Sequence, residues 1–354
     1  MTALSFWRLV RIAGLSIAAL VAPSAPASAL FAGESIVRVR MEGPIQRIVR
    51  AAPTSTPAFA GTLTLDGSEQ ALAIRISARG LSRRRRESCD FPPLRVEFLN
   101  PPAAGTLFEG QERLKLVTHC RSESSFQQHV LLEYAAYRLL NILTPRSFRV
   151  RLAQIEYADT ERTARALSRV AFFIEDVDDV AQRNGLLEAG SVNIRHTQLS
   201  APDTARFAIF QYMIGNVDWS AQTGPPGSGC CHNSKLLGAG SGSTTGLIAV
   251  PYDFDQSGIV DVPYAVVPPQ LGLRSVRERR YRGYCIHNEE VQAAAAQATS
   301  LRPELEGAIS EVPGMEQGTR RNALNYLARF FEDIETSARI SARLLRNCRA
   351  SGAD

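Results

Sequence analysis

The stretch from Gln211 to Asp261 contains the residues whose types and spacing could do chemistry. An apolar run that is typical of a helix ends at Gly215, and Asp218 follows three residues later. Acidic and amide side chains just beyond a rigid element are exposed and held in place, which is how proteins present polar groups to a metal or a reacting group. The alternative is a surface loop whose polar residues only cap and turn the chain.

A second polar loop follows the same pattern. Asn233 comes after a loop rich in Gly and Pro, and a Gly/Ser loop then leads into an apolar strand from Leu247 to Pro251. Asp253 and Asp255 follow this strand at once. A chain that leaves a helix at one polar loop and returns along a strand can bring the two loops together. We therefore predict that Asp218, Asn233 and Asp253 converge on one divalent-metal site. Asp255 is expected close by.

The second loop also resembles part of a calcium-binding loop. The spacing D-x-D-x-S-G-x-x-D begins at Asp253 and ends at Asp261, as in the first part of an EF-hand loop. The twelfth position is Tyr264 rather than Glu, and the preceding element is an expected strand rather than a helix. We therefore reject an EF-hand. A structural Ca²⁺ at this loop is the alternative to Mg²⁺.

The first 29 residues are typical of a secretory signal peptide. Arg8 and Arg11 precede an apolar run, and small residues follow it, so cleavage is expected after Ala29. The apolar run is short for a membrane span, and an uncleaved anchor is the alternative. We find no later run that is long and apolar enough to cross a bilayer. The mature protein is therefore expected to be periplasmic or secreted, with no membrane span.

The net charge argues against a nucleic-acid-binding protein, and the length limits the number of domains. The formal net charge is +5, and removal of Arg8 and Arg11 leaves 5 − 2 = +3, which is no signature of nucleic-acid binding. The dense basic run from Arg83 to Arg86 is typical of a solvated hairpin tip, although it would suit a phosphate-rich ligand. A mature chain of about 325 residues can form one large or two modest domains.

All six cysteines lie in the mature chain, and an even number in an exported protein indicates up to three disulfides. Cys89 with Cys120 would tie together the N-terminal β-region. A bond between the neighbours Cys230 and Cys231 would be strained, so we expect those two to pair elsewhere. Their candidate partners are Cys285 and Cys348. Zinc is the rival interpretation, but no CxxC spacing supports it.

The elements that must position these residues fall into two groups. Period-two alternation between residues 35 and 99 predicts an antiparallel sheet with one buried face. The elements expected after it are a strand carrying Lys115, a helix over 125–143, strands over 150–158 and 169–177, a helix over 203–214, and helices in much of 289–348. Strands and helices are segregated along the chain, which favours the α+β class.

Four segments between Arg75 and Tyr264 carry a resemblance to a known family. They are IRISARG with PPLRVEFL, RLKLVTHC with the helix and strand after it, RVAFFIEDVD, and NVDWSAQTG…HNSKLL…IAVPYDFDQSG. They resemble the RGNSS…KKSYRIKF, strand–helix, GVYLLLEKID and NWDxxxxNxxLY…WDLD segments of the CotH-type kinase-like proteins, the spore-coat CotH family. The more distant resemblance is to the protein-kinase, lipid-kinase and HipA superfamily. This chain lacks the paired lysines of KKSY, and an insertion lengthens the interval from Asp218 to Asn233.

The resemblance implies an α+β, two-lobed kinase-like fold. A β-rich N-terminal lobe with one helix would span 30–180, and a mostly helical C-terminal lobe with the catalytic-like loops would span 181–354. Asp218 would be the catalytic-loop carboxylate. Asn233, Asp253 and Asp255 would bind Mg²⁺ or Mn²⁺, because phosphoryl transfer depends on positioning and charge neutralisation.

The resemblance also implies nucleotide-binding residues. Lys115 would hold phosphates, and Glu133 on the following helix would pair with it, with their charged atoms within about 4 Å or bridged by a ligand. The alternative is a surface ion pair of little consequence. Lys235 could approach the phosphates as well, although an exposed strand lysine explains it equally.

The leading hypothesis is an exported CotH-like protein with metal-dependent ATP binding and phosphoryl transfer to a protein or other hydroxyl acceptor. Its partners would be the nucleotide and a protein or small-molecule acceptor, and no nucleic acid. The alternative is a non-catalytic secreted or envelope-structural binding protein that keeps the fold and a structural Ca²⁺. Whether the protein is an enzyme stays open at this point.

Overall fold

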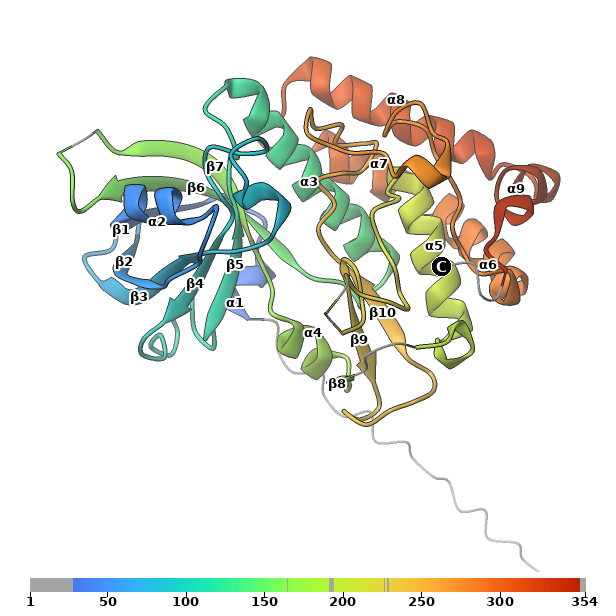
Figure 1. Cartoon of the computed structure of the whole chain (residues 1–354), viewed down its shortest axis with the longest axis horizontal. Helices are drawn as coiled ribbons and strands as arrows, with labels where there is room; N and C mark the ends of the chain where they lie inside the picture. Colours follow the sequence, from blue (N-terminus) through green and yellow to red (C-terminus); the bar gives the residue numbers. More distant parts are fainter. Residues whose placement is uncertain (1–27, 164, 191–193, 226, 228, 351–354) are drawn as a thin grey trace, which may run out of the picture.

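The computed structural model describes residues 28–350 except 164, 191–193, 226 and 228. The predicted signal peptide therefore lies almost wholly outside the described residues. Two parts are visible in Figure 1, a set of strands and a set of helices, with helix α3 (Ser124–Leu143) between them. No helix among the described residues is long and apolar enough to cross a membrane.

Seven strands of the N-terminal half close into a barrel. They are β1 (Val37–Gly43), β2 (Phe59–Leu65), β3 (Ala71–Ala78), β4 (Leu94–Phe98), β5 (Arg113–Val117), β6 (Val150–Asp159) and β7 (Leu167–Ile174). Their order around the barrel is β1-β2-β3-β4-β5-β7-β6. Strand β1 closes the barrel because it pairs antiparallel with β2 on one side and parallel with β6 on the other. Short helices α1 (Ala29–Ala32) and α2 (Ile45–Ala51) lie beside these strands.

The barrel overturns the expected fold class. The prediction of a two-lobed kinase-like fold with a β-rich N-terminal lobe is wrong, because the strands form a closed seven-stranded barrel and the helices form a separate part. Closure depends on the pairing of Val37 with Ala153, residues far apart in the chain. Alternation of apolar residues reveals which segments are strands but not which distant strands pair.

Strand β7 lies between two hydrophobic cores, the interior of the barrel and the core shared with the helices. In β7, Phe173 points into the barrel core, whereas its neighbours Phe172 and Ile174 belong to the core shared with the helices. Both faces of this strand are therefore buried, which accounts for its continuous apolar run. The predicted strands over 150–158 and 169–177 are confirmed as β6 and β7, which pair antiparallel with Val150 opposite Ile174.

Helix α3 links the two parts. It was predicted over 125–143 and is confirmed as Ser124–Leu143, ending just before Pro145, as expected for a residue that disfavours helical conformation in its predecessor. It packs against β6, β7, α5 and α7. Because neighbours cover it on several sides, the Glu133 side chain in its middle is only 2% exposed.

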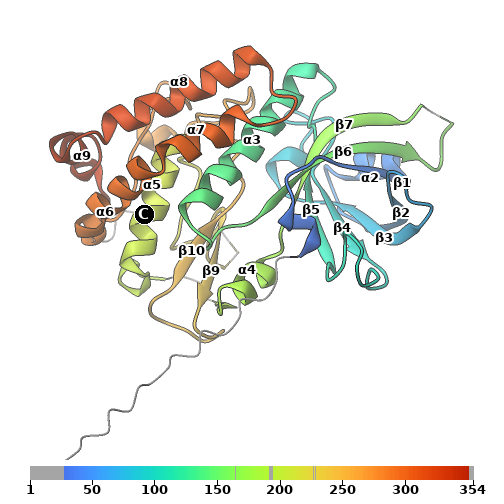
Figure 2. The same cartoon turned by 180° about the vertical axis from the view of Figure 1, so that it is seen from behind.

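The helical part also contains a small sheet. Its helices are α4 (Val177–Arg183), α5 (Ala201–Ile214), α6 (Asn288–Ser300), α7 (Arg302–Ser310), α8 (Gln317–Asp333) and α9 (Ser337–Arg343). Strands β8 (Leu187–Glu188), β9 (Ser234–Gly238) and β10 (Ile248–Pro251) form a sheet in the order β10-β9-β8, and Figure 2 shows it below α3 and α5. Short 3₁₀ turns are η1 (Ser82–Arg84), η2 (His196–Gln198), η3 (Pro269–Leu271), η4 (Cys285–His287) and η5 (Leu345–Asn347). The prediction of helices within 289–348 is confirmed.

Three disulfides join the six cysteines. The bond between Cys89 and Cys120 is confirmed. The expectation that Cys230 and Cys231 pair elsewhere is wrong, because they bond to each other. The partner of Cys285 is Cys348. This pair is brought together by the C-terminal segment, which bridges to Tyr284 in a short parallel pairing that sequence spacing cannot show.

Candidate functional site

The turn after α5 fixes the position of Asp218. The helix ends at Gly215 in the left-handed conformation (φ 66°), where an added Cβ would collide with the Tyr326 hydroxyl. Asn216 then accepts a hydrogen bond through its Oδ1 atom from the Asp218 N–H at 2.9 Å. This side-chain turn makes the chain reverse just before the carboxylate and therefore orients it.

Arg282 also supports this turn. Its guanidinium donates hydrogen bonds to the carbonyl oxygens of Val217 and Trp219 and lies 5.0 Å from the centre of the Trp219 ring. Burial lowers the pKa of Arg282 to about 10. Sequence reasoning missed this residue, since nothing in its local pattern connects it with a loop more than sixty positions upstream.

Three donors surround the Asp218 carboxylate. His232 Nε2 lies 2.7 Å from Oδ1, and the side-chain nitrogens of Asn233 and Gln256 each donate to Oδ2 at 3.0 Å. The hydrogen bond with Asp218 raises the pKa of His232. The Asp218 side chain remains 26% exposed. These contacts hold an accessible carboxylate in one orientation.

The β9–β10 hairpin brings the second polar loop to the same place. Ser234 lies opposite Pro251, and the Tyr252 N–H donates to the Asn233 carbonyl at 3.0 Å. Asn233 and Asp253 therefore occupy the same end of the hairpin, and Asn233 reaches Asp218. Both Asn233 (φ 51°) and Asp253 (φ 63°) adopt the left-handed conformation. Such strained non-glycine residues concentrate at functional sites.

Asp253 is held on both its backbone and its side chain. Its N–H donates to the Tyr137 hydroxyl at 2.9 Å, and its Oδ1 accepts a hydrogen bond from Arg83 Nη2 at 3.0 Å. The side chain is 33% exposed, so it is the accessible member of a mainly buried group. Structure and sequence agree that Asp253 is presented at the end of β10.

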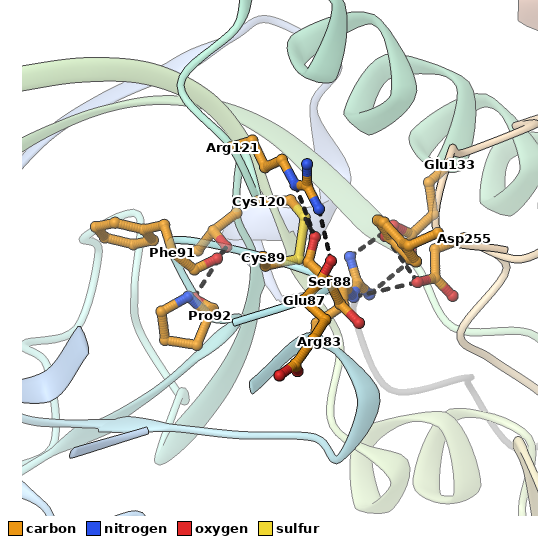
Figure 3. The surroundings of a disulfide bond; sticks show 12 residues. Arg83, Glu87, Ser88, Cys89, Phe91, Pro92, Cys120, Arg121, Glu133 and Asp255 are labelled. Atoms are coloured by element: carbon orange, nitrogen blue, oxygen red, sulfur yellow. Dashed lines mark hydrogen bonds and ion pairs between the residues drawn. A yellow bond between two sulfur atoms is a disulfide. The ribbon is translucent and has the colours of Figure 1, made fainter. Parts of the chain in front are cut away.

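This group, which we call the Arg83 cluster, consists of Arg83, Glu133, Asp253 and Asp255. Arg83 Nη1 lies 3.2 Å from Glu133, and its Nε lies 3.3 Å from Asp255. Figure 3 shows the guanidinium between these carboxylates. Burial raises the pKa of both Glu133 and Asp255, and attraction by Arg83 opposes the shift only in part. Burial disfavours the charge on Arg83, but the surrounding acids outweigh it and hold its pKa above the usual value.

The expected direct contact between Lys115 and Glu133 is wrong. Glu133 binds Arg83, whereas the Lys115 ammonium lies over the rings of Phe148 and Tyr252, 5.1 and 5.3 Å from their centres. Lys115 makes no ion pair with a carboxylate among the described residues. Burial lowers its pKa to about 8, and the charge of Arg79 adds to this effect. Arg83 was not predicted as the partner of Glu133, because a run of four arginines is typical of a solvated hairpin tip.

The remaining predicted site residues lie nearby in different roles. Lys235 on β9 pairs with Glu188 at 2.7 Å. Asp255 is buried, and its Oδ2 is bound by both Arg83 and the Tyr264 hydroxyl. Asp261, at the far end of the calcium-like spacing, pairs with Arg277 at 3.1 Å. Over the described part of the chain, no group of three or more His, Cys, Asp or Glu side chains is arranged to hold a metal ion.

Comparison with known proteins gives one structural match to report. No protein-family profile and no curated protein matches the sequence, so the resemblance to the CotH-type family stays a prediction. Among solved structures, the chain is similar to the Helicobacter pylori proinflammatory kinase CtkA. The match has 9% sequence identity, covers 72% of this chain and 92% of that chain, and has a TM-score of 0.39.

Proposed function

We propose that the protein is an exported, metal-dependent nucleotide-binding protein that transfers a phosphoryl group to a hydroxyl acceptor. The observation that carries this proposal is the Lys115 ammonium. It is half-buried beside Tyr252, the residue that precedes Asp253, and it forms no ion pair with a carboxylate among the described residues, although the charge of Asp176 acts on it from beyond ion-pair distance. A partly desolvated cation that lacks a carboxylate in direct contact is costly, and a bound phosphate would supply that contact.

Arg79 adds to the case for an anionic ligand. Its positive charge acts on Lys115, and its half-buried side chain forms no ion pair with any residue that the structure describes. Two cations that repel each other next to an accessible carboxylate favour a ligand carrying both phosphates and a metal ion. ATP with Mg²⁺ or Mn²⁺ meets this requirement.

Asp253 and Asn233 fit the metal. The Asp253 carboxylate is accessible, and the Asn233 side chain uses its nitrogen toward Asp218, which leaves its Oδ1 atom without a hydrogen bond to the described residues. Mg²⁺ is usually held by one or two protein oxygens together with phosphates and water. When bound, the ion would neutralise charge on the transferred group. Asp255, committed to Arg83 and Tyr264, is left as a support for Asp253.

Asp218 would orient the acceptor. Its carboxylate is accessible, and three donors fix its direction, so it can accept the proton of a hydroxyl group. Lys115 and Arg79 would hold phosphate oxygens while Asp218 holds the acceptor. The acceptor is a protein or a small molecule with a hydroxyl group.

The alternative, a non-catalytic binding protein, draws on a separate observation. Arg83 already occupies Oδ1 of Asp253 and Oδ2 of Asp255, which leaves fewer oxygens for a cation. The three disulfides are consistent with export to an oxidising compartment, where ATP is scarce.

Ligand loading of the mature protein distinguishes the two functions. A ligand present at 100 times its Kd stabilises the folded state by about 2.7 kcal/mol, which raises the melting temperature measurably. We expect ATP with Mg²⁺ to raise it more than either alone. A rise with Ca²⁺ alone supports the binding protein, and no change with any of these ligands contradicts the proposed function.

A further inference from the structure

Arg83 connects the barrel to the helical part. It lies in η1, on the loop between β3 and β4, and its side chain leaves the barrel to reach α3 and the segment after β10. It is 5% exposed and contacts both oxygens of Glu133, at 3.2 and 3.4 Å. A loop residue is thus the contact that joins three separate segments.

The disulfide between Cys89 and Cys120 fastens the same loop. The Cys120 carbonyl accepts hydrogen bonds from the N–H groups of Asp90 and Phe91, at 2.9 and 2.8 Å. Arg121 donates to the carbonyls of Ser88 and Glu87. Figure 3 shows the disulfide and Arg121 to one side and the contacts of Arg83 with Glu133 and Asp255 to the other. Six positions separate Arg83 from Cys89, so the bond limits how far Arg83 can withdraw.

The burial of the disulfide indicates when it acts. Cys89 and Cys120 are each 4% exposed, so a reductant reaches their sulfur atoms only when the loop opens transiently. Thiol–disulfide exchange requires such access. The bond therefore exchanges slowly in the folded protein, which suits a structural bond formed during folding in an oxidising compartment rather than a rapidly reversible switch.

We propose that oxidation of Cys89 and Cys120 completes the site by locking Arg83 between Glu133, Asp253 and Asp255. Arg83 is then a positioning residue for Asp253, which rests on the proposed function of that carboxylate. In the step, the two thiols lose two electrons and two protons to a disulfide oxidant, the Sγ–Sγ bond forms, and the oxidant is released as its dithiol. Before export, the unlocked loop would leave Asp253 without its fixed partner.

Thermodynamic linkage provides a test that needs no bound nucleotide. If the bond favours the placement of Arg83, the contacts of Arg83 must favour the bond by the same factor. Full-length mature protein is equilibrated in glutathione buffers, and each disulfide is quantified by alkylation and mass spectrometry. In Arg83→Met we expect the equilibrium constant for Cys89–Cys120 to fall about tenfold or more, while Cys285–Cys348 stays within about twofold.

Arg84→Met is the matched control, because Arg84 is the adjacent arginine and forms no ion pair among the described residues. It should leave both equilibrium constants within about twofold of the wild type. If Arg83→Met does not fold, Arg83→Lys, which keeps the charge but loses the planar fork, replaces it and should give the same direction of change. Equal equilibrium constants for Cys89–Cys120 in the Arg83 variant and the wild type would show that the disulfide does not position Arg83.

A second experiment tests whether the Cys89–Cys120 disulfide affects nucleotide binding. Affinity for Mn²⁺ with ATP should fall about tenfold or more in Cys89→Ala/Cys120→Ala and stay within about twofold in Cys285→Ala/Cys348→Ala. Equal affinity in the two double variants contradicts the positioning role of Arg83. If the wild type binds no nucleotide, the proposed function fails, and the glutathione equilibrium still decides whether the disulfide and Arg83 are coupled.

Discussion

Carboxylates are held in place in two different ways, around Asp218 and in the Arg83 cluster. Asp218 is 26% exposed and is held by His232 and two amide side chains. In the Arg83 cluster, Glu133 and Asp255 are 2% and 4% exposed and share one guanidinium. The first arrangement leaves a carboxylate free to act on a ligand, whereas the second uses carboxylates to hold the structure. Asp253 belongs to the second group but is accessible like the first.

The largest expected effect concerns stability. Arg83→Met leaves buried carboxylates without their cation, and breaking a buried ion pair in this way costs about 3–5 kcal/mol. Asp218→Asn removes hydrogen bonds that water can replace and should cost about 1 kcal/mol or less. Denaturant unfolding of both variants measures the difference. Equal losses would show that the two regions are not distinct in role.

The second prediction concerns pH and Lys115. The pKa of this lysine is about 8 in the free protein, so its positive charge is present below pH 8 and is lost above it. Nucleotide binding requires the charge, so affinity should fall about tenfold per pH unit above that value. Titration calorimetry between pH 7 and 10 checks the slope.

Lys235→Met is the control for this prediction. Lys235 pairs with Glu188, and its replacement should keep the pH dependence, whereas Lys115→Met should weaken binding at pH 7 and abolish the slope. A slope that survives in Lys115→Met assigns the titration to another group.

The smallest expected effect concerns His232. Its folded-state pKa is raised above the ordinary value of 6.5 by the hydrogen bond to Asp218. The stability from this pair is therefore fully present below pH 6.5 and is lost as the pH rises through the folded-state pKa. NMR titration should find the raised pKa in the wild type and a lower one in Asp218→Asn. An unchanged pKa in the variant would mean that Asp218 does not cause the shift.

The sequence predicts the accessible region better than the buried one. Gly215, Asp218 and the strand before Asp253 were identified because each follows a regular element that has its own local pattern. The segregation of strands from helices was likewise visible in the sequence. What joins these segments is an ion pair between a barrel loop and a helix, and no local pattern encodes it.

The errors have the same origin. Barrel closure depends on the pairing of β1 with β6, and the bond between Cys285 and Cys348 depends on where the C-terminal segment lies. The resemblance to the CotH-type family implied a pair between Lys115 and Glu133. In the structure, Arg83 from another loop pairs with Glu133 instead. Each error concerns which distant segments meet, which tertiary packing decides.

The proposed division of roles, in which Asp253 holds the metal–nucleotide and Asp218 serves the acceptor, can be separated by two variants. Isothermal titration with Mn²⁺ and ATP is carried out on the wild type, Asp253→Asn and Asp218→Asn. We predict that affinity falls about tenfold or more in Asp253→Asn and stays within about twofold in Asp218→Asn, while any phosphoryl transfer is lost in the latter. Unchanged affinity in Asp253→Asn would contradict the account.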